Sequence, residues 1–341
     1  MTTQAATDLA EVHELIVALA HEVDARWLDH LDDGAFTEAA ADAIGAAALP
    51  ERLPVPAVLT YLTAWPGLPP VVAGENEYGE PTVTVWRSEE FHIEVMVWNV
   101  GAIALHDHVN AGAFVPLEGR RFHTRYHFTP TGTWADRFTV GDLRLVRGEV
   151  LDPGAVRGIL PGVAFLHDLV FCAERCTTIS VRRRSSTGES ASYLAPGIRL
   201  PNTALGERRV RALDHLRHID RAEWNRAVAE MVSQSPETAL LSLVDLCWLM
   251  TPRQLGPVVQ RIVDRWGGDL AWWAGLVAEN MRRLRLARLL PAADPDARLA
   301  LGALRAGIDG ASAADLGVDR FPLPDDEHRT VARSRAALDW A

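Results

Sequence analysis

The sequence predicts an α+β protein in which an antiparallel β-barrel, or two-sheet roll, is flanked by helices on both sides. Two observations predict this class. Apolar residues recur at helical spacing before residue 68 and again after residue 201. Between these parts lie short runs rich in Val, Thr and aromatic residues, bounded by Gly, Pro and Asn. We therefore divide the 341 residues into an N-terminal helical region (1–68), a β-barrel (69–200) and a C-terminal helical domain (201–341).

Two helices are expected at the start of the chain. The first has Asp8 at its N-cap position and an apolar stripe at helical spacing, formed by Leu9, Val12, Ile16, Leu19 and Val23. The second is expected over residues 36–48 and is ended by Pro50.

The clearest strand signal lies at residues 91–98. Apolar Phe91, Ile93 and Val95 alternate with His92 and Glu94, which predicts a strand with one buried face. Further short strands are expected at 83–87, 103–106, 114–117, 121–128, 163–169 and 177–182. Short strands at this spacing are typical of a barrel or a double-sheet roll.

The composition excludes several classes of function. The sequence holds no lysine, so all 34 basic residues are arginine. Schiff-base enzymes, P-loop NTPases and Ser-Lys hydrolases are excluded, because each needs a lysine amine. The net charge is -11, and residues 205–341 balance 19 Arg against 19 acidic residues. We therefore expect no nucleic-acid partner.

Cysteine usage and hydropathy predict a cytoplasmic protein. Three cysteines at irregular spacing (Cys172, Cys176 and Cys247) do not form a disulfide framework, which favours a reducing compartment. The first 20 residues lack the basic start and apolar run of a signal peptide. No apolar stretch reaches the length that spans a bilayer, so no membrane partner is expected.

Three histidines carry the chemical signal. His106 and His108 form a His-x-His pair at a predicted strand, where side chains two apart share a face and can bind one metal ion. Taken alone, such a pair also fits two ordinary surface histidines. His167, which follows the Pro161-Gly162 turn into another predicted strand, supplies a third candidate. Three imidazoles leave about half of an octahedral site open for substrate and oxygen.

These residues resemble the cupin superfamily and, within it, the cysteine dioxygenase-like thiol dioxygenases. The matching phrase runs from Trp98 and Gly101 through the His-x-His pair and Leu117-Glu118-Gly119 to His167. General cupins have a glutamate a few residues after the His-x-His pair, whereas this chain has Gly112 and Ala113 in that stretch. The three-histidine thiol dioxygenases also lack that glutamate, so this difference favours the narrower resemblance.

The resemblance implies a double-stranded β-helix barrel that binds Fe(II) through His106, His108 and His167, with dioxygen as co-substrate. Three imidazoles also suit Ni, Cu and Zn, so the metal stays open. The resemblance further implies that Arg87, on an earlier strand, holds the carboxylate of the substrate. A solvated arginine at a strand end is the alternative.

Other positions depart from the family. Arg182 and Arg184 stand where the family has a histidine and a tyrosine near the iron, so positive charge replaces that network. On the strand after Gly119, His123 and His127 are expected to share one face while Tyr126 takes the other. His123 is therefore a further candidate for the cavity.

The leading hypothesis is a non-haem metal-dependent oxygenase that acts on cysteine or a related small carboxylated thiol. S-oxygenation is the simple outcome, and oxidative rearrangement in natural-product biosynthesis is a variant. The alternatives are a redox-neutral isomerase or lyase and a non-enzymatic ligand sensor. A homodimer is expected from the strand edges and the tryptophan-rich helices.

Overall fold

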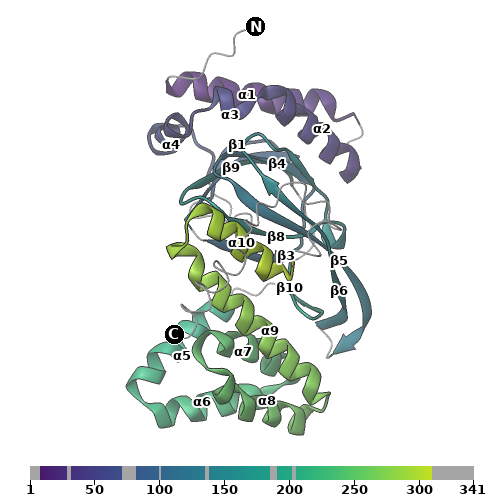
Figure 1. Cartoon of the computed structure of the whole chain (residues 1–341). Helices are drawn as coiled ribbons and strands as arrows, with labels where there is room; N and C mark the ends of the chain where they lie inside the picture. The colour runs from purple at the N-terminus through teal and green to yellow at the C-terminus, as the bar shows by residue number, and fades with distance from the viewer. Residues whose placement is uncertain are drawn as a thin grey trace.

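The computed structural model describes residues 8–28, 32–70, 82–99, 101–134, 138–184, 190–201 and 205–308. Figure 1 shows two antiparallel sheets at the centre of the molecule, purple N-terminal helices on one side and green to yellow C-terminal helices on the other. The predicted α+β class, a closed antiparallel barrel flanked by helices at both ends, is confirmed.

The N-terminal helices are α1 (Leu9–Arg26), α2 (Asp33–Ala47), α3 (Leu49–Arg52) and α4 (Val55–Ala64). As predicted, Asp8 caps α1, where its side chain accepts from the backbone N–H of Glu11 at 2.9 Å. Pro50 does not end α2. The helix ends at Ala47 and is followed by the C-cap residue Ala48, whose φ of 48° is left-handed. Pro50 lies in the first turn of α3, where its missing N–H has no helical partner to lose.

The strands form two sheets that face each other. The five-stranded sheet has the order β1-β2-β9-β4-β7, and the six-stranded sheet closes on itself in the order β10-β11-β6-β5-β8-β3. The strands of the first sheet are β1 (Thr82–Arg87), β2 (Phe91–Trp98), β4 (Gly112–Glu118), β7 (Arg157–Ile159) and β9 (Cys176–Arg183). Those of the second are β3 (Ala102–His106), β5 (Arg121–Trp134), β6 (Phe138–Leu151), β8 (Leu166–Phe171), β10 (Ala191–Leu194) and β11 (Ile198–Pro201).

Strand β2 is buried on both faces, which corrects the expectation of a single buried face. Ile93 and Val95 pack under the N-terminal helices, in the same apolar core as α1 and α2. The opposite face, with His92 and Glu94, is equally buried because it points between the two sheets. The polar alternation in β2 therefore marks an interior site and not a solvated surface.

The two histidines of β5 differ in burial. The pairing of β5 with β8 is regular from Arg121 to Tyr126, and the register shift between β5 and β6 places the extra residue, Val146, in β6. His123 is fully buried within the part of β5 that pairs with β8, whereas His127, just beyond that part, is exposed. Of the two histidines, His123 is therefore the one that lies in the interior.

Other strand boundaries also differ. Residues 163–165, expected in a strand, belong to the 3-10 helix η1 (Gly162–Phe165), and β8 begins after it. The sequence analysis missed β6, β7, β10 and β11. Strand β6 extends with β5 as a long hairpin beyond the sheet, so much of it is solvated and carries little apolar alternation.

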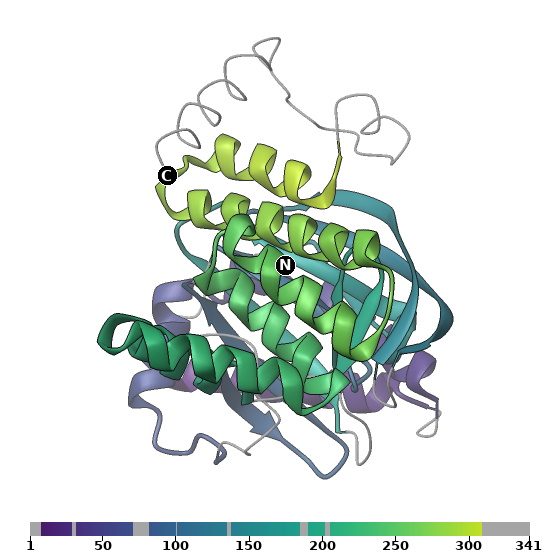
Figure 2. The same cartoon turned by 90° about the horizontal axis from the view of Figure 1, so that it is seen from below.

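The C-terminal helices are α5 (Leu205–Ile219), α6 (Arg221–Gln234), α7 (Pro236–Leu249), α8 (Pro252–Trp266), α9 (Leu270–Leu289) and α10 (Pro295–Ala306), with η2 (Leu290–Ala292) between the last two. Figure 2 shows these helices side by side in front of the strands. Helices α9 and α10 pack on Phe122 and Val170 of the six-stranded sheet. Among the described residues, no helix is long and apolar enough to cross a membrane.

Candidate metal centre

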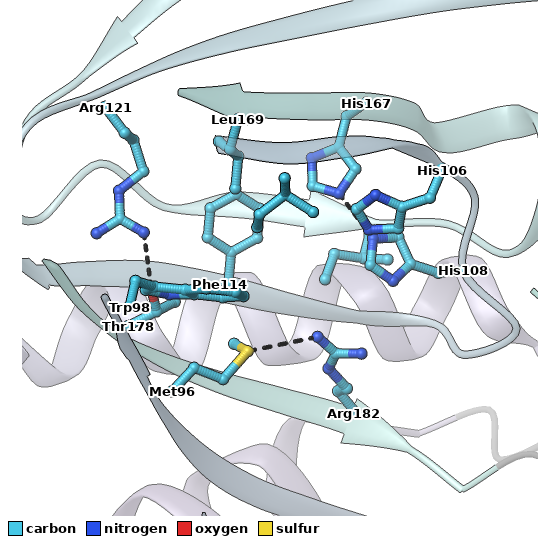
Figure 3. Close-up of a pocket in the computed structure, with 12 residues that line it drawn as sticks. Met96, Trp98, His106, His108, Phe114, Arg121, His167, Leu169, Thr178 and Arg182 are labelled. Carbon is cyan, nitrogen blue, oxygen red and sulfur yellow. Dashed lines mark hydrogen bonds between the residues drawn. The ribbon is translucent and has the colours of Figure 1, made fainter. Parts of the chain in front are cut away.

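A small cavity lies between the two sheets (Figure 3). Its volume is about 30 Å³, which holds on the order of two water molecules. Six apolar residues and six polar residues line it: Met96, Trp98, Ile103, Phe114, Ile159 and Leu169, and His106, His108, His167, Arg121, Thr178 and Arg182. The cavity therefore combines an apolar wall with imidazoles and hydrogen-bond donors at defined positions.

The three predicted histidines meet at one end of this cavity. His106 comes from the last residue of β3, His108 from the loop after it, and His167 from β8, which pairs with β3. All three are buried, and one ring nitrogen of each lies within 4.8 Å of those of the other two. The Nε2 atoms of His108 and His167 are 2.8 Å apart. Two imidazoles bound to one ion at right angles would have nitrogens about 3 Å apart, given bonds of about 2.1 Å.

Hydrogen bonds from outside the cluster orient two of these rings. His106 donates its Nδ1–H to the carbonyl of Ala104 at 2.8 Å, which leaves the Nε2 lone pair for the cavity. His167 Nδ1 lies 3.0 Å from Nε2 of His123, and His123 Nδ1 lies 2.9 Å from Glu149 Oε1. The carboxylate accepts from His123 and His123 accepts from His167, so the lone pair of His167 Nε2 faces the cluster.

Glu149 is the outer end of this histidine relay. Burial favours its neutral form, but hydrogen bonds from His123 and from Arg157 outweigh burial and hold the pKa of Glu149 well below its usual range. Arg157 binds both carboxylate oxygens, at 2.9 and 2.6 Å, and Arg147 adds a contact of 2.9 Å. The relay therefore ends in a fixed negative charge.

Burial keeps the histidine cluster neutral. It lowers the pKa of His106 to about 4, and it lowers the pKa values of His108 and His167 well below the ordinary value. The charge of Arg182 lowers the pKa values of His106 and His108 further. Neutral imidazole is the form that binds metal ions.

The donor set fits a divalent transition metal. Three neutral imidazole nitrogens converge, two of the rings are held by hydrogen bonds, and the remaining directions face a cavity. Imidazole suits Fe, Zn, Cu and Ni, so the ligands alone do not choose among them. We conclude that His106, His108 and His167 could hold one metal ion with open positions on its cavity side.

Arg182 of β9 lines the cavity close to the histidines, but its charge is already paired. Its Nε lies 2.5 Å from Oε1 of Glu94, whose side chain is 1% exposed. Ser180 accepts a further hydrogen bond from Nε at 3.2 Å, and Nη2 lies 3.8 Å from the sulfur of Met96. The buried carboxylate on β2 therefore neutralises and positions this guanidinium.

Arg121 lines the same cavity, and Figure 3 shows it at the end opposite the histidines. It is fully buried at the start of β5. Its Nη1 donates to Oγ1 of Thr178 at 2.6 Å, and Trp98 Nε1 donates to the same oxygen at 2.9 Å. Burial lowers the pKa of Arg121 to about 10, so the side chain stays charged at neutral pH.

The other two predicted arginines lie away from the cavity lining. Arg87 is the last residue of β1, the edge strand of the five-stranded sheet, and is paired in register with His92. Arg184 follows β9 and donates from Nη1 to the carbonyls of Ser88 and Glu89, both at 3.4 Å. Arg184 therefore holds the β1–β2 turn, and the carboxylate-binding role of Arg87 stays a prediction.

The residue after each of two histidines ties the strands to their surroundings. Asp107 accepts from the backbone N–H of Ala191 at 2.5 Å and from the hydroxyl of Tyr193 at 2.9 Å. Asp168 is 3.1 Å from Arg305 of α10, which also donates to the carbonyl of Ile103 on β3 at 3.2 Å. Alternation along β8 sends Asp168 away from the metal cluster, whereas Asp107, which follows β3, is held by its contacts with β10.

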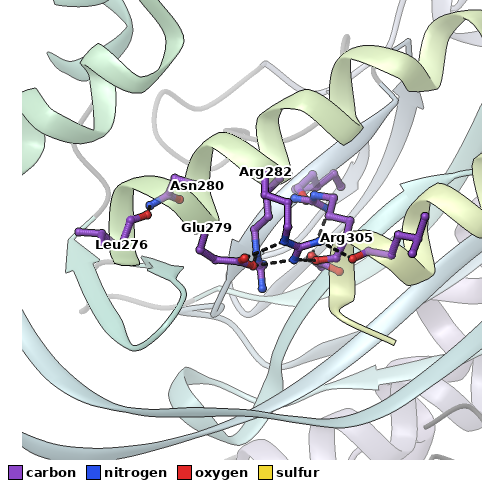
Figure 4. Close-up of polar contacts among 9 residues, drawn as sticks. Leu276, Glu279, Asn280, Arg282 and Arg305 are labelled. Carbon is purple, nitrogen blue, oxygen red and sulfur yellow. Dashed lines mark hydrogen bonds and ion pairs between the residues drawn. The ribbon is translucent and has the colours of Figure 1, made fainter. Parts of the chain in front are cut away.

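Helix α9 fixes the end of α10 that carries Arg305 (Figure 4). Arg282 of α9 donates to the carbonyl oxygens of Leu304 at 2.5 Å and Arg305 at 3.1 Å. Glu279 holds Arg282 through two contacts of 2.7 Å. The C-terminal helices thus reach β3 and β8, the strands of His106 and His167, through a defined set of polar contacts.

The sequence analysis missed three of the residues that shape the site. Arg121 has the same parity as His123 on β5, so that alternation could have placed it inside. Glu94 alternates with the apolar face of β2, and its polarity was taken as a sign of solvent. Glu149 lies on an unpredicted strand, directly opposite His123 in the β5–β6 register, and nothing local in the sequence indicates it.

No family model and no curated protein sequence matches the chain. Among solved structures, it is similar to a cupin-2 domain protein from Shewanella frigidimarina (15% identity, 31% of this chain and 83% of that chain, TM-score 0.22). It is also similar to a hydroquinone 1,2-dioxygenase from Sphingomonas with bound 4-hydroxybenzoate (14% identity, 33% of this chain and 70% of that chain, TM-score 0.25). A third similar structure is a DMSP lyase (12% identity, 52% of this chain and 96% of that chain, TM-score 0.29).

Proposed function

We propose that this protein is a cupin-type, metal-dependent oxygenase that acts on a small thiol bearing a carboxylate. The single observation that carries the proposal is the oriented cluster of His106, His108 and His167 at one end of a cavity between the two sheets that has an apolar wall. A neutral three-nitrogen site with open positions suits Fe(II), which reacts with dioxygen in facial-triad enzymes. When bound, Fe(II) would supply the one-electron chemistry that dioxygen needs in order to react with a thiolate.

The surroundings of the cluster suit this reaction. His123 and Glu149 fix the tautomer of His167, and Ala104 fixes that of His106, so these two ligand nitrogens present lone pairs and not protons to the cluster. Apolar side chains such as Phe114 and Leu169 exclude bulk water beside the cluster. Exclusion of water protects a reactive intermediate from side reactions.

Positive charge in the cavity supports an acidic substrate. Arg121 and Arg182 both line it, and Arg182 lies beside the histidines in Figure 3. A guanidinium favours the thiolate over the thiol and attracts a carboxylate. In the simplest reaction both atoms of dioxygen join the sulfur and yield a sulfinic acid, so that the sulfur is oxidised by four electrons and dioxygen is fully reduced.

Oxygen uptake tests the proposal. Protein loaded with Fe(II) is mixed with cysteine, 3-sulfanylpropanoate and uncharged thiols, and products are analysed by mass spectrometry. Uptake of one dioxygen per thiol with a product 32 mass units heavier (about twice the mass of oxygen) is expected for S-dioxygenation. Uptake with another mass change would indicate an oxidative rearrangement, the natural-product variant.

The control for this assay is His106→Ala with the same panel, which removes a ligand but leaves both arginines in place. If no thiol causes uptake in the wild type although the metal binds, the thiol class is wrong. Substrate turnover without oxygen uptake would instead favour a redox-neutral isomerase or lyase, in which the metal acts as a Lewis acid.

A further inference from the structure

The two arginines of the cavity differ in how their charge is compensated. Arg182 forms an ion pair with Glu94 at 2.5 Å. Arg121 is 0% exposed, and within the described part of the chain no carboxylate lies within ion-pair distance of it. An uncompensated charge in a protein interior is strongly unfavourable, so a fold that retains one is suited to an incoming counter-charge.

The hydrogen bonds of Arg121 hold its position without cancelling its charge. Its Nη2 donates to the carbonyls of Glu118 at 3.1 Å, Thr177 at 3.4 Å and Gly119 at 3.5 Å. The guanidinium carbon also lies 5.5 Å from the ring centroid of Phe171. Its buried Nε has no hydrogen-bond partner among the residues that the structure describes. Carbonyl dipoles and a ring face solvate a cation, but the net charge remains.

Thr178 adds a second donor at the same end of the cavity. Its Oγ1 accepts hydrogen bonds from Arg121 and from Trp98, so the hydroxyl proton must point elsewhere. Thr178 itself lines the cavity. This end therefore presents a cation and a hydroxyl donor, and both suit the oxygens of an anion.

We propose that Arg121 and Thr178 form the site that binds the carboxylate of the substrate, at the end of the cavity opposite the metal ligands. Figure 3 shows Phe114 and Leu169 between Arg121 and the histidines. The ligand is thus a small carboxylate whose apolar middle contacts Phe114 and Leu169. Because the cavity itself holds only about two water molecules, these side chains must shift to admit it. That its far end is a thiol rests on the proposed function, whereas the carboxylate site does not.

This assignment moves the carboxylate away from Arg87, the position that the family resemblance implies. Arg87 does not line the cavity, and Glu94 already pairs with the other candidate, Arg182. Binding at Arg182 would have to compete with a buried carboxylate at 2.5 Å, whereas Arg121 offers an unpaired charge.

Calorimetric titration tests the site apart from catalysis. The probes are 3-sulfanylpropanoate and 2-sulfanylethanol, which lacks the carboxylate, and each is titrated into metal-free and Zn(II)-loaded protein, because zinc does not react with dioxygen. Both forms should prefer the carboxylate probe. In Arg121→Met the preference should fall roughly 10- to 100-fold, the range for loss of a charged hydrogen bond. Arg120→Met, the same substitution at an exposed neighbour, should keep it.

A second pair of variants covers the case in which Arg121→Met does not fold. Thr178→Val removes the hydroxyl donor at nearly constant volume and should lower the preference for the carboxylate, whereas Thr178→Ser should retain it. The proposal is overturned if wild-type protein binds both probes equally, or if Arg182→Met alone abolishes the preference. Carboxylate binding that depends on Arg121, without oxygen uptake by Fe(II)-loaded protein, would retain this site and reject the oxygenase.

Discussion

The two sheets of the barrel are covered by helices in different ways. The five-stranded sheet lies under the N-terminal helices, in a continuous apolar core that includes Phe36, Ile93 and Val181. The polar contacts across this boundary are few among the described residues, such as the ion pair of Asp33 and Arg183 at 2.6 Å, which is partly solvated.

The six-stranded sheet is covered by apolar contacts and also by buried charge. Helix α10 packs so closely on it that a Cβ at Gly302 would lie 3.0 Å from the ring of Phe122. Beside this contact Arg305 reaches Asp168, the residue after His167. Apolar contacts are non-directional, whereas a buried ion pair joins two particular side chains, here one on α10 and one on β8. The sheet that carries the metal ligands is the one with the second kind of contact.

The largest effect is expected from a metal ligand itself. His108→Ala should reduce bound metal to a trace, because two imidazoles remain and the affected position opens to the cavity. The loss should exceed the roughly 10- to 100-fold cost of removing an outer partner of a ligand. Metal content after dialysis against equimolar Fe(II) or Zn(II) measures it, with His127→Ala, at an exposed position of β5, as the control.

The next largest effect separates stability from metal binding. Phe36→Ala removes a fully buried ring that packs against Trp27 at 4.8 Å and Phe91 at 5.8 Å between centroids. The free energy of unfolding should fall by about 3–5 kcal/mol, while metal affinity stays unchanged. Denaturant titration and metal titration measure the two quantities. Leu28→Ala, at an 88% exposed side chain, should change neither, and a loss of metal affinity in Phe36→Ala would remove the contrast between the coverings.

Arg305→Met should lower both the free energy of unfolding and the metal affinity. This double effect would distinguish the C-terminal helices from the N-terminal ones, whose loss of packing should change stability alone. Asp168 would keep a buried charge without its ion-pair partner, so stability should fall by about 3 kcal/mol. Metal affinity should fall with it, because the pair reaches the strands of His106 and His167. Arg226→Met, which breaks an exposed pair with Glu223, should cost less than about 1 kcal/mol.

The double variant Asp168→Asn with Arg305→Met sharpens this test. Removal of both charges should cost less than the sum of the single variants, because no charge is left unpaired. Additive losses would mean that the two side chains act independently and that the ion pair does not hold the strands.

Glu149→Gln should lower metal affinity by roughly 10- to 100-fold with little change in the fold. The amide can still accept from His123, but the negative charge that stabilises the donated proton is lost. Competition with a chromophoric chelator measures the affinity. Asp152→Asn, which removes an exposed carboxylate paired with Arg120, is the matched control, and equal affinity in the two variants would show that the relay does not act on the metal.

The metal ligands could be predicted from the sequence because their signal is local. His106 and His108 stand two residues apart at a strand end, and His167 follows a Pro-Gly turn, so spacing alone raises the hypothesis. The order of a helical part, a strand part and a second helical part could also be predicted, because the spacing of apolar residues changes from helical to strand-like and back.

The supporting residues could not be predicted, because each depends on pairing between distant parts of the chain. Glu149 faces His123 only through the β5–β6 register, and Arg305 is 202 residues from the Ile103 carbonyl that it contacts. The register shift opposite Tyr126 adds Val146 to β6, and nothing local in the sequence indicates it. Local period indicates which residues face inward, but register and packing decide what they meet there.

The last effect concerns pH, and it again separates the two coverings. Burial keeps the pKa of His106 at about 4 and those of His108 and His167 well below the ordinary value of about 6.5. Below pH of about 6.5 the unfolded chain therefore binds protons that the folded chain does not bind. Stability of the metal-free protein should fall as pH is lowered from about 6.5 toward 4, by up to about 1.4 kcal/mol per pH unit for each histidine.

Denaturant midpoints at pH 7, 6 and 5 (roughly spanning the ordinary histidine range) measure this slope. His106→Gln should make the slope shallower, whereas His21→Gln, on the exposed side of α1, should not. Phe36→Ala should lower stability equally at each pH, because a phenyl ring binds no proton. If His106→Gln instead lowered the midpoint equally at each pH and left the slope unchanged, the unfolding transition would not expose the metal cluster. The two sheets would then unfold separately.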